Sequence, residues 1–313
     1  MTAPLVSIVL PTRNGMDTLP GVLAGISTQE FDGAVEIVAI DTASTDGTVD
    51  HLRPRVTRLL HVDAGAFNHG LTRNRAIEAT CGQFVVLLSQ DAEPANAHWL
   101  SRLVAPLRAR ALVAGSFARQ VPRAGTGAIV RHYHAQWAGS SPQPRTASIA
   151  SATAFQALRP LEQMRLCTFD NVCSCVRREV WTMHPFPRTP IAEDLEWARE
   201  VLLAGYEIDY VPDSVVVHSH DRSARYEFDR TVLLHQQLHR LFGIRTIPTL
   251  GSLTRATIST IALHRRLRTH APAGSARETP GRALALAVAW PAGQYVGGRR
   301  GHRGLAPLET DAV

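Results

Sequence analysis

Hydrophobic residues in the first part of the chain occur in short runs separated by longer amphipathic stretches. Residues 5–10, 35–40 and 84–88 are runs rich in Val, Ile and Leu, each about the length of one strand. Such runs are typical of strands that are covered on both faces of a parallel sheet. Helical patterns lie between them, at residues 18–28 and 72–80. The alternation of strand and helix predicts a Rossmann-like α/β domain with a mostly parallel central sheet and flanking helices.

The second part of the chain has less regular patterns. Residues 138–151 are dense in Gly, Ser and Pro, which predicts a loop near the ligand-binding edge of the sheet. Capping and turn residues at 42–48 predict a helix start near Asp46. The other predicted elements are strands at 58–62, 111–117, 206–211 and 214–218, and helices at 154–166, 178–183 and 195–204.

The pattern changes again after residue 222. Long Arg- and His-rich helical segments continue to about residue 268, and a break rich in Pro, Gly and Ala covers residues 271–281. We therefore predict two units, an α/β domain at residues 1–222 and a helical C-terminal extension with a basic tail at residues 223–313.

The basic residues are unusual in kind rather than in number. All 33 of them are arginine, and the chain has a formal net charge of +6. An all-arginine set indicates a bias toward GC-rich codons more than a nucleic-acid surface, so we expect no nucleic-acid partner. The charge still favours anionic ligands and anionic membrane surfaces.

Cysteine usage and hydropathy bear on the cellular compartment. The four cysteines have no CxxC spacing, which argues against a zinc site and against a disulfide framework. The first residues have no secretory signal pattern, and the chain has no apolar run of about 18 residues that could span a membrane. We therefore expect a cytoplasmic protein.

Two acidic clusters indicate the chemistry. Asp91 and Glu93 directly follow the apolar run at 84–88, and Glu193 and Asp194 come much later in the chain. The carboxyl ends of parallel strands form the ligand-binding edge of open α/β sheets. One carboxylate there can hold a divalent cation against a leaving diphosphate, while another removes a proton from an attacking hydroxyl. The pattern predicts group transfer from a nucleotide-activated donor.

Several motifs occur in order along the chain, at residues 9–14, 40–48, 67–74, 89–92, 193–194 and 218–220. On these motifs the chain resembles the family 2 inverting glycosyltransferases of the GT-A fold, and within them the bacterial rhamnosyltransferase-like group. The resemblance covers about residues 5–222. It implies an enzyme that transfers a sugar, with inversion, from a nucleotide-diphosphate donor to a hydroxyl group.

The resemblance also implies which residues bind the donor nucleotide. Pro11, Thr12 and Arg13 border the base and ribose, and Asp41 accepts a hydrogen bond from the pyrimidine N–H. A fixed carboxylate there would select uracil or thymine over cytosine, because the wrong base leaves polar groups unpaired. The alternative for Asp41 is an ordinary turn residue after a strand.

Three further residues are implied in donor binding. The guanidinium of Arg73 can pair with a diphosphate oxygen, although an arginine on a helix surface would have the same sequence pattern. Gln90 lies between Ser89 and Asp91, and Asn171 falls where relatives bind the donor sugar or the acceptor.

The family's metal motif, Asp-x-Asp, is incomplete in this chain. Ser89 stands in place of the first acid, which leaves Asp91 as the implied carboxylate ligand. A divalent cation, Mg²⁺ or Mn²⁺, is still expected, because one carboxylate can hold it together with diphosphate oxygens and waters. His218 is implied as a supplementary ligand, and His220 would face the same side of a strand.

Asp194 matches the family's catalytic base. Inversion requires the acceptor hydroxyl to attack opposite the departing diphosphate, so the base lies across the sugar from the metal. The non-catalytic explanation is that Glu193 and Asp194 begin a helix and are stabilised by its dipole.

The expected function is transfer of rhamnose from dTDP-rhamnose to an envelope glycan or a lipid-linked acceptor. Two alternatives stay open. One is a UDP-hexose transferase of the same fold, and the other is a non-catalytic nucleotide-sugar-binding scaffold, which the substitution at Ser89 suggests.

The C-terminal extension has two interpretations. Arg-rich clusters at residues 265–268 and 299–303 flank an apolar stretch at 283–290, with Trp290 and Tyr295 placed for lipid headgroups. These features predict a peripheral contact with the inner membrane face. The alternative is a helical flap packed on the α/β domain.

Overall fold

The apolar runs predicted as strands lie at the centre of a nine-stranded sheet in the computed structural model, which describes residues 5–271, 275–276 and 278–307. The strand order is β3-β2-β1-β4-β8-β6-β9-β5, and β7 pairs with β9. The strands are β1 Val6–Thr12, β2 Val35–Thr42, β3 Arg58–Val62, β4 Phe84–Leu88, β5 Glu93–Pro94, β6 Val113–Val121, β7 Arg145–Ala147, β8 Cys173–Arg177 and β9 Glu207–Val217.

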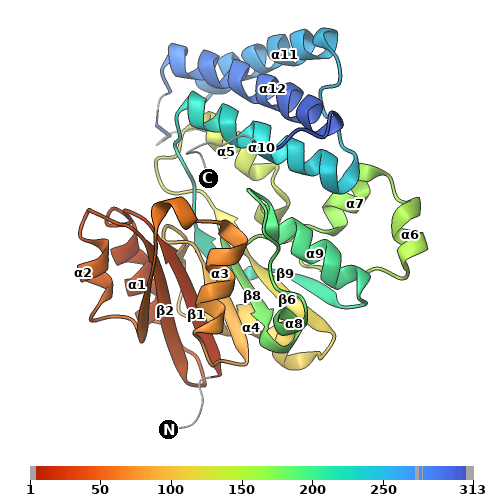
Figure 1. Ribbon diagram of the computed structural model, residues 1–313. Coiled ribbons are helices and arrows are strands. Elements are labelled where there is room, and N and C mark those ends of the chain that lie inside the picture. The colour runs from red at the N-terminus through yellow and green to blue at the C-terminus, as the bar shows by residue number, and fades with distance from the viewer. Residues whose placement is uncertain (1–4, 272–274, 277, 308–313) are drawn as a thin grey trace.

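Helices lie on both faces of the sheet, and α10, α11 and α12 form a separate layer beyond one end of it (Figure 1). That end is opposite the start of β1, so the carboxyl ends of the central strands point toward this layer. The helices are α1 Leu19–Ser27, α2 Thr48–Leu52, α3 His69–Glu78, α4 Trp99–Ala109, α5 Ala128–Ala135, α6 Ala152–Ala157, α7 Pro160–Leu166, α8 Arg178–Met183, α9 Glu193–Leu203, α10 Ala224–Phe242, α11 Leu250–Thr269 and α12 Pro280–His302, with short 3-10 turns at Ala64–Ala66 and Ala138–Ser140.

The sheet is mostly parallel, as the sequence predicts. Strands β1 to β4, β6 and β9 run in one direction, and β5, β7 and β8 run against them. β8 lies between β4 and β6 and pairs with both. It has no long apolar run, and the hydroxyl of its buried Ser174 donates to Asn171 Oδ1 at 2.9 Å. For this reason the hydrophobic pattern does not predict β8.

Alternate residues of the central strands pack into two separate hydrophobic cores. Val85 and Leu87 of β4 face one core, whereas Phe84, Val86 and Leu88 face the other. Because both faces of the strand are buried, every position in the run is apolar.

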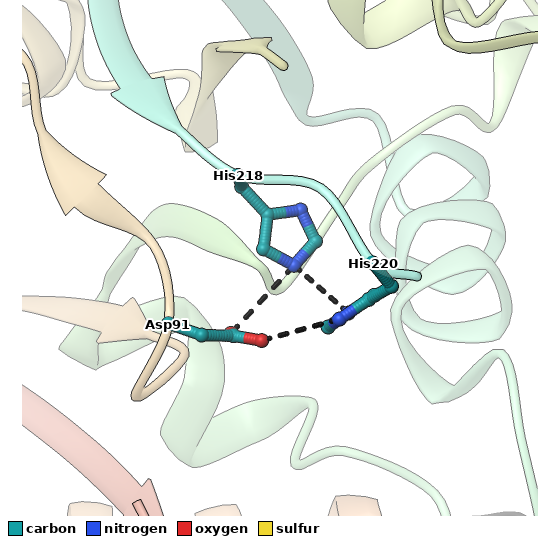
Figure 2. A group of neighbouring side chains, drawn as sticks. All are labelled: Asp91, His218 and His220. Carbon is teal, nitrogen blue, oxygen red and sulfur yellow. Dashed lines mark hydrogen bonds and ion pairs between the residues drawn. The ribbon is translucent and has the colours of Figure 1, made fainter. Parts of the chain in front are cut away.

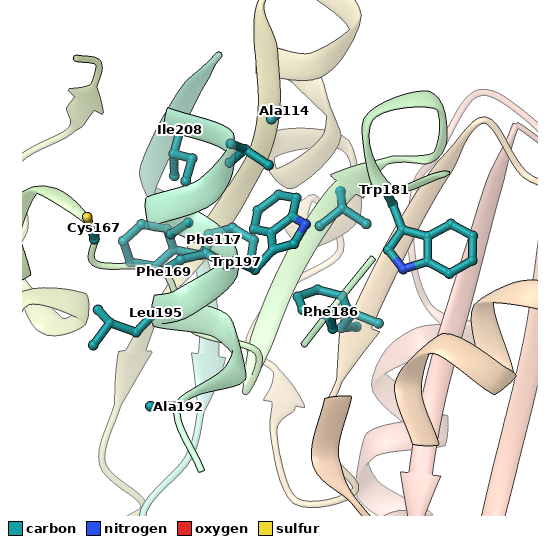
Figure 3. Close-up of a cluster of buried hydrophobic side chains, with 14 of the residues drawn as sticks. Ala114, Phe117, Cys167, Phe169, Trp181, Phe186, Ala192, Leu195, Trp197 and Ile208 are labelled. Carbon is teal, nitrogen blue, oxygen red and sulfur yellow. The ribbon is translucent and has the colours of Figure 1, made fainter. Parts of the chain in front are cut away.

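Trp197 of α9 is fully buried in the first of these cores (Figure 3). The centroid of its ring lies 4.9 Å from that of Phe169 and 5.4 Å from that of Phe186. Its indole N–H donates to the carbonyl oxygen of His184 at 2.8 Å. These contacts hold α9 against the sheet and thereby position the acidic residues in its first turn.

Several predicted elements differ from the structure. The helix predicted at 154–166 is two helices, α6 and α7, because Pro160 at the first position of α7 cannot continue a preceding helix. The strands predicted at 206–211 and 214–218 are one strand, β9, whose pairing with β6 skips past Pro212. Proline has no N–H for the ladder, which explains the interruption. Helices α4 and α5 have no counterpart in the prediction.

The C-terminal helices pack closely on one another. α12 runs along α10, and α11 packs on α12 and α5. A Cβ atom on Gly297 of α12 would lie 2.3 Å from the carbonyl oxygen of Val232 in α10, so only glycine permits this approach. α10 begins at Ala224, next to the predicted boundary, and the division into 1–222 and 223–313 itself stays a prediction.

Trp290 lies within this helical layer. Its indole N–H donates to Glu227 at 3.0 Å, and its ring packs edge-on against Tyr133 and His264. The ring and its polar group are therefore engaged inside the protein, which differs from the predicted placement at lipid headgroups. In the part of the chain that the structure describes, no helix combines the length and the hydropathy needed to cross a bilayer.

Candidate active site

The predicted site residues gather at the carboxyl ends of the parallel strands. Thr12 ends β1 and Asp41 is the second-last residue of β2, while Asp91 follows β4 and His218 follows β9. Since these strands run in the same direction, the four residues share one edge of the sheet.

Asp41 is buried and held by its neighbours. Its Oδ1 accepts hydrogen bonds from the hydroxyls of Thr12 at 3.0 Å and of Ser44 at 2.5 Å, and its Oδ2 accepts from the Ser44 N–H at 2.9 Å. Ala43, which follows β2, has a φ of 52°, a left-handed conformation that is rare for alanine. The carboxylate thus has a fixed position, and the part of Pro11, Thr12 and Asp41 in nucleotide binding stays a prediction.

Gln90 joins the loop after β4 to the loop after β1. Its side-chain carbonyl accepts from the N–H of Arg13 at 2.8 Å, and its side-chain NH₂ donates to the carbonyl oxygen of Arg13 at 2.9 Å. A Cβ atom on Gly15 would lie 2.5 Å from Oε1 of Gln90, so a larger residue there would displace this amide. Both ends of the amide bind the Arg13 backbone, and a direct contact of Gln90 or Arg13 with a donor stays a prediction.

Asp91, His218 and His220 form a group that could hold a metal ion (Figure 2). Nε2 of His218 lies 3.6 Å from Oδ1 of Asp91, and Nδ1 of His220 lies 3.4 Å from Oδ2. The two histidine Nε2 atoms are 3.0 Å apart. The sequence analysis expected His218 and His220 to face this side as alternate residues of a strand. Both do lie beside Asp91, but they follow β9, which ends at Val217, and the chain turns there.

The chemistry of this donor set fits a divalent cation. A carboxylate and imidazole nitrogens are common ligands of such cations, and imidazole binds a metal in its neutral form. Burial lowers the pKa of His218 to about 3, although the charge of Asp91 acts in the opposite direction. The ring is therefore neutral at physiological pH, as a metal ligand must be. The guanidinium of Arg123 donates to the backbone carbonyl oxygen of Asp91 and stiffens this turn.

Arg73 forms a buried ion pair with Glu193. Its Nη1 lies 2.7 Å from Oε1 of Glu193, and the same oxygen accepts from Nδ2 of Asn171 at 3.2 Å. Burial by itself raises the pKa of Glu193, but the charges of Arg73 and His69 outweigh it and the net shift is downward. Arg73 therefore pairs with a carboxylate of the protein, and its contact with a donor diphosphate stays a prediction.

Asp194 lies next to this pair and has the opposite pKa shift. Its Oδ1 accepts from the N–H of Leu195 at 2.7 Å, and its Oδ2 accepts from the N–H of Asn171 at 3.2 Å. Burial, followed by the charges of Glu193 and Asp170, raises the pKa of Asp194 to about 8. Adjacent carboxyl groups whose pKa values are pushed apart are typical of sites that divide acid and base roles.

The sequence analysis did not single out Asp170, Gln120 or Arg230. Asp170 is adjacent to Asn171, so the sequence did contain a signal for it. Gln120 lies in β6 without a motif around it, and only the fold brings its side chain to Asp170. Arg230 belongs to α10. Burial is the main cause that lowers the pKa of His220, and the positive charge of Arg230 adds to it.

Solved structures with a similar fold define the fold class of this protein. The chain is similar to the mannosyltransferase PcManGT from Pyrobaculum calidifontis, solved in complex with GDP-Man and Mn²⁺, with a TM-score of 0.59 and 20% identity over 96% of this chain and 88% of that one. It is also similar to glucosyl-3-phosphoglycerate synthase from Mycobacterium tuberculosis, solved with Mn²⁺, UDP and glucosyl-3-phosphoglycerate, with a TM-score of 0.53 and 21% identity over 79% and 82% of the two chains. These likenesses show a GT-A-like α/β fold.

The family follows from the sequence match. Residues 7–178 match the family described as Glycosyl transferase family 2, and this is more than half of the chain. The protein therefore belongs to glycosyl transferase family 2 and is a glycosyltransferase.

Two curated relatives are O-antigen chain rhamnosyltransferases. RfbN of Salmonella typhimurium is 28% identical over 231 residues, which cover 72% of this chain and 69% of that protein. WbaN of Salmonella anatum is 26% identical over 232 residues, which cover 72% and 70% of the two proteins. The predicted family, the rhamnosyltransferase-like group, the GT-A fold and the enzyme class are confirmed.

Proposed function

We propose that this enzyme transfers rhamnose from dTDP-rhamnose to a hydroxyl group of an envelope glycan or a lipid-linked acceptor, with inversion at the anomeric carbon. The observation that carries the proposal is the combination of the Asp91, His218 and His220 group with the raised pKa of Asp194 at the same edge of the fold. The likeness to the rhamnosyltransferases RfbN and WbaN supports rhamnose as the sugar.

In this mechanism Asp194 is the general base. The acceptor hydroxyl gives its proton to the Asp194 carboxylate while its oxygen forms a bond to the anomeric carbon. The bond from that carbon to the donor diphosphate breaks, and its electron pair leaves with the diphosphate. Attack on the side opposite the leaving group inverts the anomeric carbon. Only the ionised carboxylate accepts a proton, so the rate should rise with pH through the pKa of about 8.

Asp91, His218 and His220 would hold the divalent cation, Mg²⁺ or Mn²⁺. A bound cation would supply positive charge against the charge that develops on the leaving diphosphate. The mannosyltransferase PcManGT, solved with GDP-Man and Mn²⁺, supports a cation in this fold.

The donor itself would be bound by the residues that the family resemblance implies. A UDP-hexose transferase would use the same positions, so the choice of donor has to be measured. The proposed donor-binding residues are Pro11, Thr12, Arg13, Asp41, Arg73, Gln90 and Asn171.

The donor is tested by assaying hydrolysis and transfer by the purified protein. Each assay offers dTDP-rhamnose or a UDP-sugar, with Mg²⁺ or Mn²⁺ and with EDTA. We expect turnover of dTDP-rhamnose that EDTA abolishes. Turnover of UDP-hexoses alone would instead support the UDP-hexose transferase, and donor binding without any turnover would support the scaffold. Full activity in EDTA would contradict an essential cation.

The base is tested by Asp194→Asn. This variant should keep donor affinity near the wild-type value and lower turnover about a hundredfold or more, the range expected for loss of a general base. The matched control is Glu179→Gln, which replaces an exposed carboxylate in the first turn of α8 and should change neither quantity. Unchanged turnover in Asp194→Asn contradicts the assignment.

We also propose that the C-terminal helices touch the inner membrane face. Leu284 and Val288 of α12 are 51% and 45% exposed and, with Phe228 of α10, line an open groove of about 620 Å³. Arg225 lines the same groove, and apolar side chains beside arginines are typical of interfacial helices.

Flotation with anionic liposomes at low and high salt tests this contact. We expect flotation at low salt that is lost when Leu284→Ser and Val288→Ser are combined. The control Leu112→Ser changes an equally exposed leucine that follows α4 and should still float. Absence of wild-type flotation at low salt rules the contact out.

A further inference from the structure

The side chain of Gln120 connects the two halves of the candidate site. Gln120 is 5% exposed and lies in β6, which has β8 on one side and β9 on the other. Its Nε2 donates to Oδ2 of Asp170, just before β8, at 2.6 Å. Its Oε1 lies 2.9 Å from Nδ1 of His218, just after β9. The Gln120 amide therefore connects Asp170, which lies near Asp194, to His218 of the candidate metal site.

The orientation of this amide is determined by Asp170. A carboxamide has one end that only donates and one that only accepts. The other contacts of Asp170 are also with donors, the indole N–H of Trp137 at 3.3 Å and the backbone N–H of Val172 at 2.9 Å. The donating end of Gln120 must therefore face Asp170, and its accepting end must face His218.

This orientation determines the tautomer of His218. An acceptor at 2.9 Å from Nδ1 requires that nitrogen to bear the hydrogen. Nε2 then bears no hydrogen and has a lone pair, and it is the nitrogen that lies toward Asp91 and His220 (Figure 2). A histidine binds a metal through such a lone pair, and the hydrogen bond of its other nitrogen sets the ring orientation.

We propose that Gln120 is a positioning residue, oriented by Asp170, that holds His218 as the Nδ1–H tautomer so that Nε2 is available to a divalent cation. The inference rests on the metal site of the proposed function. The same arrangement links that site to the base, because the N–H of Asn171, adjacent to Asp170, donates to Asp194.

The first test measures the tautomer directly. Long-range ¹H–¹⁵N correlation spectra of metal-free protein labelled with ¹⁵N-histidine separate the two tautomers, and His218→Gln identifies the signals of His218. The wild-type protein should show hydrogen on Nδ1, whereas Gln120→Leu should shift His218 toward the Nε2–H form. A wild-type His218 with hydrogen on Nε2 overturns the inference, and this measurement needs no variant of Gln120 to fold.

The second test measures affinity for Mn²⁺ alone, from the electron paramagnetic resonance signal of the free ion. Gln120→Leu should weaken binding by about 10- to 100-fold, the usual effect of removing the partner of a metal-ligating histidine. The control Gln136→Leu removes another glutamine that contacts a histidine. Nε2 of Gln136 lies 2.6 Å from Nε2 of His132, at the exposed surface beside α5. This control variant should bind Mn²⁺ as the wild type does.

The outcomes separate this inference from the proposed function. If the wild type binds Mn²⁺, equal affinity in Gln120→Leu overturns the positioning role. A wild-type protein that has the Nδ1–H tautomer, loses it in Gln120→Leu and binds no Mn²⁺ supports the positioning of His218 but contradicts the metal site. Thermal unfolding of both glutamine variants verifies that they are folded.

Discussion

Asp194→Asn should stabilise the folded protein at high pH and leave its stability near the wild-type value at pH 5. Burial and the neighbouring charges of Glu193 and Asp170 raise the pKa of Asp194 from 3.8 to about 8 in the folded state. A carboxyl group with a raised pKa binds its proton more tightly in the folded chain, so its ionisation destabilises the fold. This cost is absent below the unfolded-state pKa, grows as the pH rises above it, and is complete above the folded-state pKa. Asparagine mimics the neutral form at every pH.

The size of the effect follows from the pKa shift. Between pH 5 and pH 8 the cost of ionising Asp194 can grow by at most about 4 kcal/mol, at about 1.4 kcal/mol for each pKa unit. Asp194 is partly exposed, and solvent screening reduces the expected growth to about 2 kcal/mol. Asparagine has only one accepting oxygen, so it can keep only one of the two hydrogen bonds that Leu195 and Asn171 donate to Asp194. The lost bond lowers the stability of the variant by about 1 kcal/mol. The variant should therefore match the wild type near pH 5 and be about 2 kcal/mol more stable near pH 9.

Urea unfolding followed by tryptophan fluorescence at the two pH values measures this difference. Glu179→Gln again is the control, and its free energy of unfolding should differ little from the wild-type value at either pH. An Asp194→Asn variant that is destabilised equally at both pH values would refute the raised pKa. A variant that is more stable and inactive would mean that the wild type retains this carboxylate for function at a cost in stability.

Two other substitutions test the packing around the site. Arg73→Met should lower the free energy of unfolding by about 3 to 5 kcal/mol, because it leaves the carboxylate of Glu193 buried without its partner. Adding Glu193→Gln should recover part of that loss in urea unfolding, and a double variant no more stable than Arg73→Met contradicts the pairing. Gly297→Ala should cost about 1 to 3 kcal/mol, since the new methyl group meets the carbonyl oxygen of Val232. Gly281→Ala, with open space around its position, should be neutral or stabilising. A melting temperature of Gly297→Ala above that of Gly281→Ala would contradict the packing of α12 on α10.

Local sequence patterns determined most of the central α/β architecture. The run at residues 84–88 is apolar at every position because β4 is buried on both faces, and such a run is visible without any knowledge of its neighbours. The motifs around Asp91 and Asp194 were visible for a similar reason, since carboxylates directly after a strand or at a helix start form a local pattern. β8 was not visible, because its buried polar residue is satisfied by a side chain that the pattern does not reveal.

Only the tertiary structure decided which side chains meet. Arg73 and Glu193 are separated by 120 positions, and Gln120 and His218 by 98. The first pair forms because α3 packs against α9, and the second because β6 lies beside β9 in the sheet. A sequence pattern reports the local periodicity and burial of one element, whereas strand order and helix packing depend on contacts between distant segments. The sequence therefore suggested that Arg73 contacts a diphosphate or solvent, and only the packing of α3 on α9 placed it against a buried carboxylate.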